Sequence, residues 1–147
     1  PGTVEVEIHL VDLSATPEFP LAQLSSSVTV GSAAVSPAAP VTEQNSHPYE
    51  TVRYTLTLTN HGNLTDTFTL ETSGNLWDTL LSETSVTLAP GASREITVTV
   101  QVPAGKDGEQ DSATIIATST NIPGVSEEIT LTTTRTWHKL IFPLIMN

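Results

Sequence analysis

The sequence predicts an all-β protein built as a two-layered antiparallel sandwich, and three observations lead to this fold class. Ser and Thr together make up about a quarter of the chain, and β-branched Thr suits the solvated face of a pleated sheet. Short runs alternate apolar with polar residues, and turn-forming residues interrupt them every ~8–12 residues. No segment has the pattern of a helix that could connect parallel strands, so the strands are expected to pair antiparallel.

The most regular part of the chain begins near residue 51. Apolar side chains occupy every second position at Val52, Tyr54, Leu56 and Leu58. The turn-forming segment 60–63 follows, and the next strand runs through Phe68 and Leu70, which together predict a β-hairpin. Trp77 lies in an irregular stretch and is expected to fill the core from a loop.

Further strands complete one sandwich. They are expected at residues 86–88, 95–102, 112–119 and 127–135, with turns that contain Pro-Gly between several of them. Residues 41–135 would thus supply about seven strands, enough for one immunoglobulin-like β-sandwich. Residues 1–40 are expected to form an N-terminal strand extension and a Pro/Ala-rich linker, and the stretch 35–48 reads as extended chain. Residues 136–147 are expected to form an apolar C-terminal strand or tail.

Charge and cysteine content exclude several classes of function. The chain has 147 residues, with 16 acidic against 5 basic side chains and a net charge of −11. Such a surface repels phosphate backbones and anionic lipid, so neither nucleic-acid binding nor membrane association is expected. No Cys is present, which excludes disulfides, zinc–thiolate sites and thiol catalysis. No apolar run is long enough for a membrane-spanning helix, so membrane insertion is not expected.

Two segments carry a family resemblance, namely YTLTLTNHGNLTDTFTLETSGNLW and VTLAPGASREITVTVQVPAGKDG. A strand ends in Asn-x-Gly, a Phe-centred strand and a Trp follow, and after a Pro-Gly turn another strand closes on Val-Pro. The positions are Asn60, Gly62, Phe68, Trp77, Pro90, Gly91, Val102 and Pro103. The pattern resembles immunoglobulin-like surface domains of bacteria and archaea, including the NEW3-like and CARDB-like modules of secreted hydrolases and S-layer-type proteins. This resemblance covers about residues 50–135 and implies fold rather than function.

Catalytic motifs are missing from the sequence. It holds no G-x-S-x-G elbow, no H-E-x-x-H pair and no phosphate-binding loop, and its four His residues are scattered. Neither an enzyme activity nor a cofactor is therefore expected.

Two weaker features concern calcium and glycans. Asp107, Glu109 and Asp111 alternate in a Gly-containing loop, and alternating carboxylates can supply the oxygen ligands of Ca²⁺. The loop lacks the Asp-x-Asp-x-Asp-Gly order, so a solvated acidic loop is favoured over a metal site. Asn63 heads the N-x-[ST] sequence Asn-Leu-Thr and is a candidate glycosylation site.

Both ends of the chain carry apolar residues that the sandwich does not need. At the N-terminal end these are Val4, Val6, Ile8 and Leu10, and at the C-terminal end Leu140, Ile141, Phe142, Leu144 and Ile145. The ends could add strands to their own sandwich, pack on missing parts of a larger protein, or complete a sheet in another subunit. The third explanation is preferred, with the N-terminal strand as donor, because a head-to-tail exchange builds a filament and covers the apolar residues.

The sequence therefore predicts a non-enzymatic structural protein at the cell surface or outside the cell. It would be the self-assembling subunit of a filament or sheath, joined to copies of itself by donor-strand β-augmentation. The alternative is an accessory module of a secreted hydrolase or S-layer-type protein that binds a carbohydrate or a surface. In that case Trp77 or Tyr54 would contact a glycan.

Overall fold

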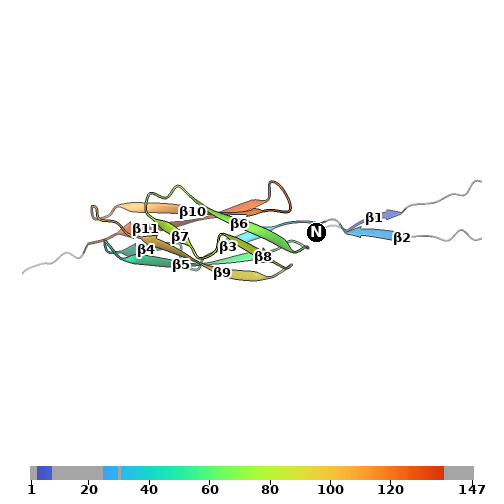
Figure 1. The fold of residues 1–147 in the computed structure, drawn as a ribbon, viewed down its shortest axis with the longest axis horizontal. Helices are drawn as coiled ribbons and strands as arrows, with labels where there is room; N and C mark the ends of the chain where they lie inside the picture. The colour runs from blue at the N-terminus through green and yellow to red at the C-terminus, as the bar shows by residue number, and fades with distance from the viewer. Residues whose placement is uncertain (1–2, 8–24, 30, 138–147) are drawn as a thin grey trace, which may run out of the picture.

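A computed structural model describes residues 3–7, 25–29 and 31–137 of the chain. Two facing sheets form a β-sandwich, which confirms the expected fold class (Figure 1). The five-stranded sheet contains, in spatial order, β4 (Glu43–Ser46), β11 (Ser126–Arg135), β10 (Gln110–Ser119), β6 (Asp66–Ser73) and β8 (Ser85–Leu88). The four-stranded sheet contains β3 (Val35–Ala38), β5 (Thr51–Asn60), β9 (Ser93–Gln101) and β7 (Thr79–Leu81).

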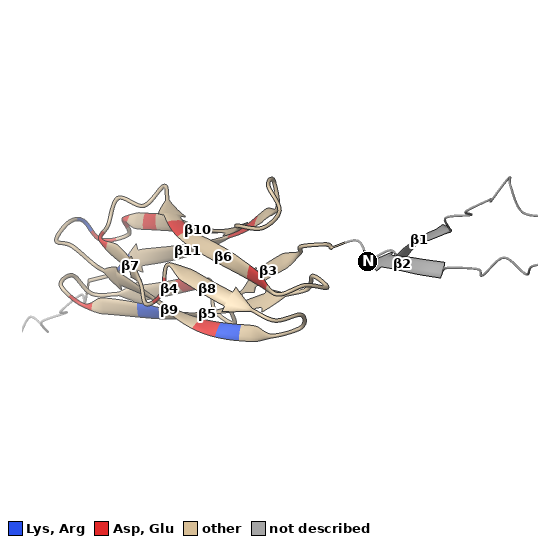
Figure 2. Ribbon diagram, turned by 45° about the vertical axis from the view of Figure 1, so that its right-hand side comes forward, with Lys and Arg blue, Asp and Glu red and all other residues tan. Residues whose placement is uncertain are grey.

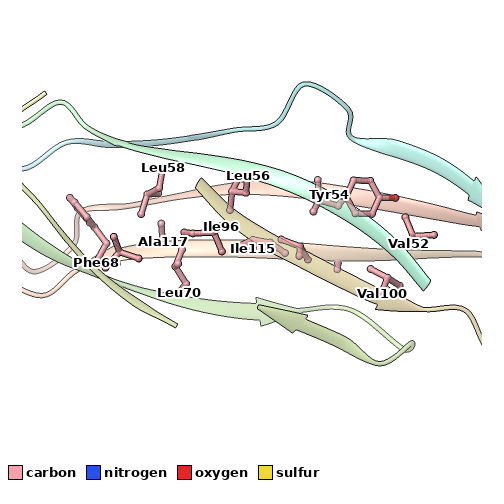
Figure 3. Close-up of a cluster of buried hydrophobic side chains, with 14 of the residues drawn as sticks. Val52, Tyr54, Leu56, Leu58, Phe68, Leu70, Ile96, Val100, Ile115 and Ala117 are labelled. Atoms are coloured by element: carbon pink, nitrogen blue, oxygen red, sulfur yellow. The ribbon is translucent and has the colours of Figure 1, made fainter. Parts of the chain in front are cut away.

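The core lies between the two sheets and follows directly from the sequence alternation. Leu56 of β5, Ile96 of β9 and Ile115 of β10 are each 0% exposed (Figure 3). The Thr side chains between such positions lie on the outer faces. Burying one such side chain stabilises the fold by about 1.5–3 kcal/mol. Trp77 is buried in the loop between β6 and β7, as predicted.

The predicted hairpin between residues 51 and 70 is wrong. β5 pairs with β3 and β9, whereas β6 pairs with β10 and β8 in the opposite sheet. The segment between β5 and β6 therefore crosses from one sheet to the other. Strands in either sheet show the same alternation because both bury one face in the same core, so periodicity cannot say which sheet a strand joins.

The Pro/Ala-rich stretch 35–48 contains two edge strands rather than a linker alone. β3 pairs antiparallel with β5, and after the bend near Pro40 the chain enters β4, which pairs parallel with β11 in the other sheet. The stretch thus switches sheets and belongs to the sandwich. Pro37 and Pro40 are tolerated here because edge positions do not need every backbone N–H.

The opposite side of the sandwich has a second switch. β7 pairs with β9 in the four-stranded sheet, and β8 then pairs with β6 in the five-stranded sheet. Both lateral sides are thus closed by short strands that change sheets, which limits the length of any exposed edge.

The chain enters and leaves the sandwich at opposite ends of its long axis (Figure 1). We call the end near Val35 and the loop 61–65 the N-terminal pole, because Val35 pairs with Asn60 there. The other end, formed by the loops 47–50, 74–78 and 102–109 and by residues 135–137, is the C-terminal pole.

The N-terminal extension forms its own two-stranded sheet. β1 (Thr3–Glu7) pairs antiparallel with β2 (Ser25–Thr29), and Val4 lies opposite Val28 in this ladder. The first strand therefore already has a backbone partner within its own chain.

Candidate functional site

A hollow on the sandwich lies where β6 and β7 face each other from the two sheets. It has a volume of about 430 Å³, within the range of small-ligand sites. We call it the β6–β7 groove; its lining residues are Leu70, Glu71, Thr72, Thr79, Leu80, Leu81 and Thr84. Leu80 is 57% exposed and Leu81 is half-buried, so the groove presents apolar surface to solvent.

Backbone groups on both sides of the groove face no neighbouring strand. β8 pairs with β6 only from Asp66 to Thr69, and one further bond joins Leu70 N to Thr84 O (2.8 Å). β7 is the last strand of its sheet and pairs with β9 alone. The groove therefore combines an apolar lining with two short open strand edges, and this combination suits an extended peptide.

A buried cation stabilises the C-terminal pole. Arg135 is 1% exposed and lies over the ring of Trp77, with its guanidinium carbon 4.8 Å from the ring centroid. The guanidinium donates to the carboxylate of Glu109, so the charge is paired at the boundary with solvent. These contacts fix the last residues of β11 against the core.

A buried carboxylate holds the loop that carries Trp77. Asp111 Oδ1 accepts from Leu76 N at 2.8 Å, and Asp111 Oδ2 accepts from Trp77 N at 3.0 Å. Asp111 is 6% exposed, so both of these charge-assisted bonds are shielded from water.

Two further buried polar residues organise the N-terminal pole. Asn60 donates to the carbonyls of Leu64 and Leu88 and accepts from Gly62 N, which shapes the crossing between the sheets. Asp66 Oδ2 accepts from Ser119 Oγ at 2.6 Å, whereas Asp66 Oδ1 is buried without a hydrogen-bond partner. A cavity of about 30 Å³ beside Asp66 has room for one water molecule.

The structure does not gather the three carboxylates of the candidate calcium loop. Asp107 accepts from Trp137 N, Glu109 binds Arg135 and accepts from Lys106 N, and Asp111 faces the protein interior. Within the described part of the chain, no group of three or more His, Cys, Asp or Glu residues could hold a metal ion. Asp111 is the second residue of β10 and is buried, whereas Asp107 and Glu109 are exposed in the loop that precedes the strand, and this difference separates Asp111 from the other two carboxylates.

Two aromatic residues that a glycan was expected to contact are buried. Tyr54 is 1% exposed and Trp77 is 8% exposed, so neither presents its ring to a ligand. The candidate glycosylation site Asn63 is half-buried beside the N-terminal pole, and its Oδ1 accepts from Ser32 N at 2.8 Å. Glycosylation of Asn63 stays a prediction.

The apolar residues expected at subunit interfaces lie largely outside the described residues. Ile8, Leu10 and the C-terminal set Leu140, Ile141, Phe142, Leu144 and Ile145 belong to that part. Val4 and Val6 lie on β1 opposite Val28 and Ser26 of β2. An interface at either end stays a prediction.

Sequence reasoning missed Arg135, Asp66 and Leu80. Arg135 occupies an inward position of β11, two residues after Thr133 and four after Leu131, both buried. The alternation along β11 therefore places Arg135 on the buried face, and this could have been read from the sequence. Asp66 gave no comparable signal, because its partner Ser119 is distant in the sequence.

A family model matches residues 43–136, which is more than half of the chain. Its description reads "IG-like fold at C-terminal of FixG, putative oxidoreductase". The chain therefore belongs to this family of immunoglobulin-like domains. The match supports the immunoglobulin-like module expected from the sequence, but not the NEW3-like or CARDB-like families in particular. No curated protein sequence matches the chain.

Solved structures support the same fold. A FixG-related protein from Vibrio parahaemolyticus has a TM-score of 0.53 and 13% identity over 71% of this chain and 97% of that one. The PapD-like domain 7 of human CEP192 has a TM-score of 0.53 and 15% identity over 85% of this chain and 100% of that one. A family 123 glycoside hydrolase from Clostridium perfringens has a TM-score of 0.57 and 8% identity over 75% of this chain but only 28% of the enzyme. At these identities the likeness concerns the fold alone.

Proposed function

We propose that this chain is a non-enzymatic structural module of the cell exterior, and that copies of it join in series into a filament or sheath. The observation that supports this proposal is that the chain enters and leaves the sandwich on opposite sides. The polypeptide enters at the N-terminal pole and leaves at the C-terminal pole (Figure 1). A sandwich whose chain enters at one pole and leaves at the other can contact one neighbour on each side, and such contacts join copies in series.

The non-enzymatic part of the proposal is supported by the positions of the described His residues. His61 is exposed in the crossing between the sheets, and His47 Nδ1 lies 2.7 Å from the carbonyl oxygen of Thr136. Ser46, the Ser next to His47, donates its hydroxyl proton to Glu50 at 3.1 Å. A nucleophilic Ser would instead direct that proton at an imidazole base.

The surface charge is compatible with an exposed structural role. Acidic residues are spread over both sheets and the connecting loops (Figure 2). Such a distribution keeps the protein soluble and makes the faces of the two sheets mutually repulsive, so it disfavours unspecific face-to-face aggregation. Among residues 3–7, 25–29 and 31–137 there is no helix with the length and hydropathy of a membrane span.

The test is the native size of the purified full chain. Light scattering and negative-stain electron microscopy over a concentration series should show linear assemblies that lengthen with concentration. A matched chain that lacks residues 138–147 should stay monomeric with an unchanged β-sheet circular dichroism spectrum. A full chain that stays monomeric at every concentration would refute assembly in series.

A second candidate is an accessory module of a larger secreted enzyme. The specific observation in its favour is that two similar structures are parts of longer chains. The glycoside hydrolase matches over 28% of its length, and the secreted serine protease VesC from Vibrio cholerae over 23% of its length at a TM-score of 0.50. For this candidate, the full chain should be monomeric and should co-sediment with an insoluble polysaccharide.

A further inference from the structure

The β6–β7 groove is a surface to which the fold itself assigns no occupant. β8 pairs with β6 only from Asp66 to Thr69. The residues that precede β8 in the chain cross from β7 in the other sheet, so they do not continue the pairing along β6. The edge of β6 beyond Leu70 is thus open. Leu81 of β7, which pairs with the buried Val98, faces it across the groove, whereas the exposed Leu80 lies at the rim, on the outer face of its sheet. A short apolar strand laid along Glu71 and Thr72 would continue the line of β8.

Of the two apolar end segments, the C-terminal one suits this groove better than the N-terminal strand expected as donor, because β1 already pairs with β2 and carries Glu5 and Glu7. Residues 138–147 read HKLIFPLIMN, which is almost entirely apolar and contains no acidic side chain. The rim of the groove carries Glu71, and the chain as a whole is strongly acidic, so a segment without carboxylate side chains is favoured over an acidic one. Pro143 lacks an N–H group, but a strand added at an edge needs partners on only one side.

The segment is too short to fill the groove of its own copy. Arg135 lies level with Glu109, and Thr72 lies level with Ile115, so about six residues, or roughly 20 Å, separate the two levels along the strands. β10 lies between β11 and β6, which adds roughly 10 Å sideways. A straight path of about 22 Å uses about seven extended residues after Trp137. At most about three of the ten would remain, and the reversal of direction uses some of these.

We propose that the β6–β7 groove receives the C-terminal segment, residues 138–147, of a second copy of this chain. Arriving from a neighbour, the whole segment is available and spans about 33 Å when extended. Backbone bonds to the open edge of β6 give the contact its direction, and the apolar side chains cover Leu81 inside the groove and reach Leu80 at its rim. The contact is heterologous, because a pole of one copy meets the side of the next, so it propagates along a series. This inference rests on the proposed function, since it names the joint through which copies connect.

The absence of Cys from the chain allows a direct test by disulfide cross-linking. Full-length Leu80→Cys and Leu144→Cys chains, one of them carrying a mass tag, are mixed in equal amounts and oxidised mildly. Non-reducing electrophoresis should then show a mixed dimer. The control pairs Leu144→Cys with Glu128→Cys, because Glu128 is exposed on β11 of the five-stranded sheet, level with Glu71 of β6 and two strands away from it. The groove pair should cross-link at least tenfold more than the control pair.

The outcomes separate the joint from assembly itself. If the full chain assembles but Leu80→Cys cross-links no better than the control, the groove is not the joint, although the proposed function stands. If the double variant Leu80→Cys/Leu144→Cys closes into an oxidised monomer instead of a ladder of multimers, the occupant is the chain's own segment and the inference fails. If the full chain never assembles, the proposed function fails, and the inference fails with it.

Discussion

The hydroxyl of Tyr54 is the most informative single group for the stability of the sandwich, because it joins the two sheets. It donates to the carbonyl oxygen of Thr132 at 2.7 Å and lies 2.9 Å from the hydroxyl oxygen of Thr133. Tyr54 belongs to β5, whereas both partners belong to β11 of the other sheet. Substituting Tyr54→Phe removes these bonds and keeps the ring in the core.

The expected loss of stability follows from the burial of the Tyr54 hydroxyl and of its two partners. The lost bond to a carbonyl contributes about 1 kcal/mol, and stranding the Thr133 hydroxyl, which is 1% exposed, costs about 1 kcal/mol more. The free energy of unfolding should thus fall by about 2 kcal/mol. In urea this lowers the midpoint by about 1 M for a slope near 2 kcal/mol per M. Intrinsic fluorescence of the buried Trp77 is a suitable probe.

The pH dependence gives the same substitution a second readout. Burial raises the pKa of the Tyr54 hydroxyl above its ordinary value near 10. Above pH ~10 the unfolded chain releases this proton while the folded chain keeps it, so stability falls as pH rises from the unfolded pKa towards the folded pKa. The advantage of the wild type over Tyr54→Phe should be complete below pH ~10 and shrink above it.

The matched control is Tyr49→Phe, because Tyr49 is 79% exposed. This substitution should leave the urea midpoint unchanged. The reasoning is refuted if Tyr54→Phe costs no more than Tyr49→Phe, or if the difference between wild type and Tyr54→Phe stays constant from pH 7 to 11.

Three further predictions concern the poles. Asp111→Asn should lower the free energy of unfolding by about 2 kcal/mol, because it loses one of two buried charge-assisted bonds. Asp66→Asn should lower it less, because one Asp66 oxygen has no partner to lose, and equal decreases in urea titrations would contradict this. Gly105→Ala should be destabilising, since the added methyl would meet the buried Arg135 guanidinium; an unchanged melting temperature would show that Arg135 can move aside. Chelator should leave the urea midpoint unchanged, because the carboxylates of the loop 104–111 have protein partners; a chelator-induced decrease would reveal a metal site.

The core could be predicted from the sequence because one alternation pattern determines it. Val52, Leu56 and Leu58 are buried as their spacing indicates, and Trp77 fills the core from a loop. The sheet to which each strand belongs could not be predicted. β5 and β6 show the same periodicity, and their separation depends on the pairing of β6 with the much later β10.

The candidate site was beyond the reach of sequence reasoning for a related reason. The β6–β7 groove exists because β7 and β8, only three residues apart in the chain, join different sheets. Leu80 and Leu81 look like ordinary core residues until that switch is known. Interactions between distant residues, such as Arg135 with Trp77, likewise arise only from the three-dimensional fold.

The parallel pairing of β4 with β11 has a mechanical consequence. Four residue pairs, from Glu43 with Thr132 to Ser46 with Arg135, join the strand near the chain entry to the strand at the chain exit. A pull on the two ends of the chain drags β4 towards the N-terminal pole and β11 towards the C-terminal pole. All the bonds of this ladder then bear the load together, in shear, instead of opening one after another. Tension along the long axis therefore acts on the direction in which the sandwich is hardest to separate, and its lifetime under load is set by the rate of that one rupture.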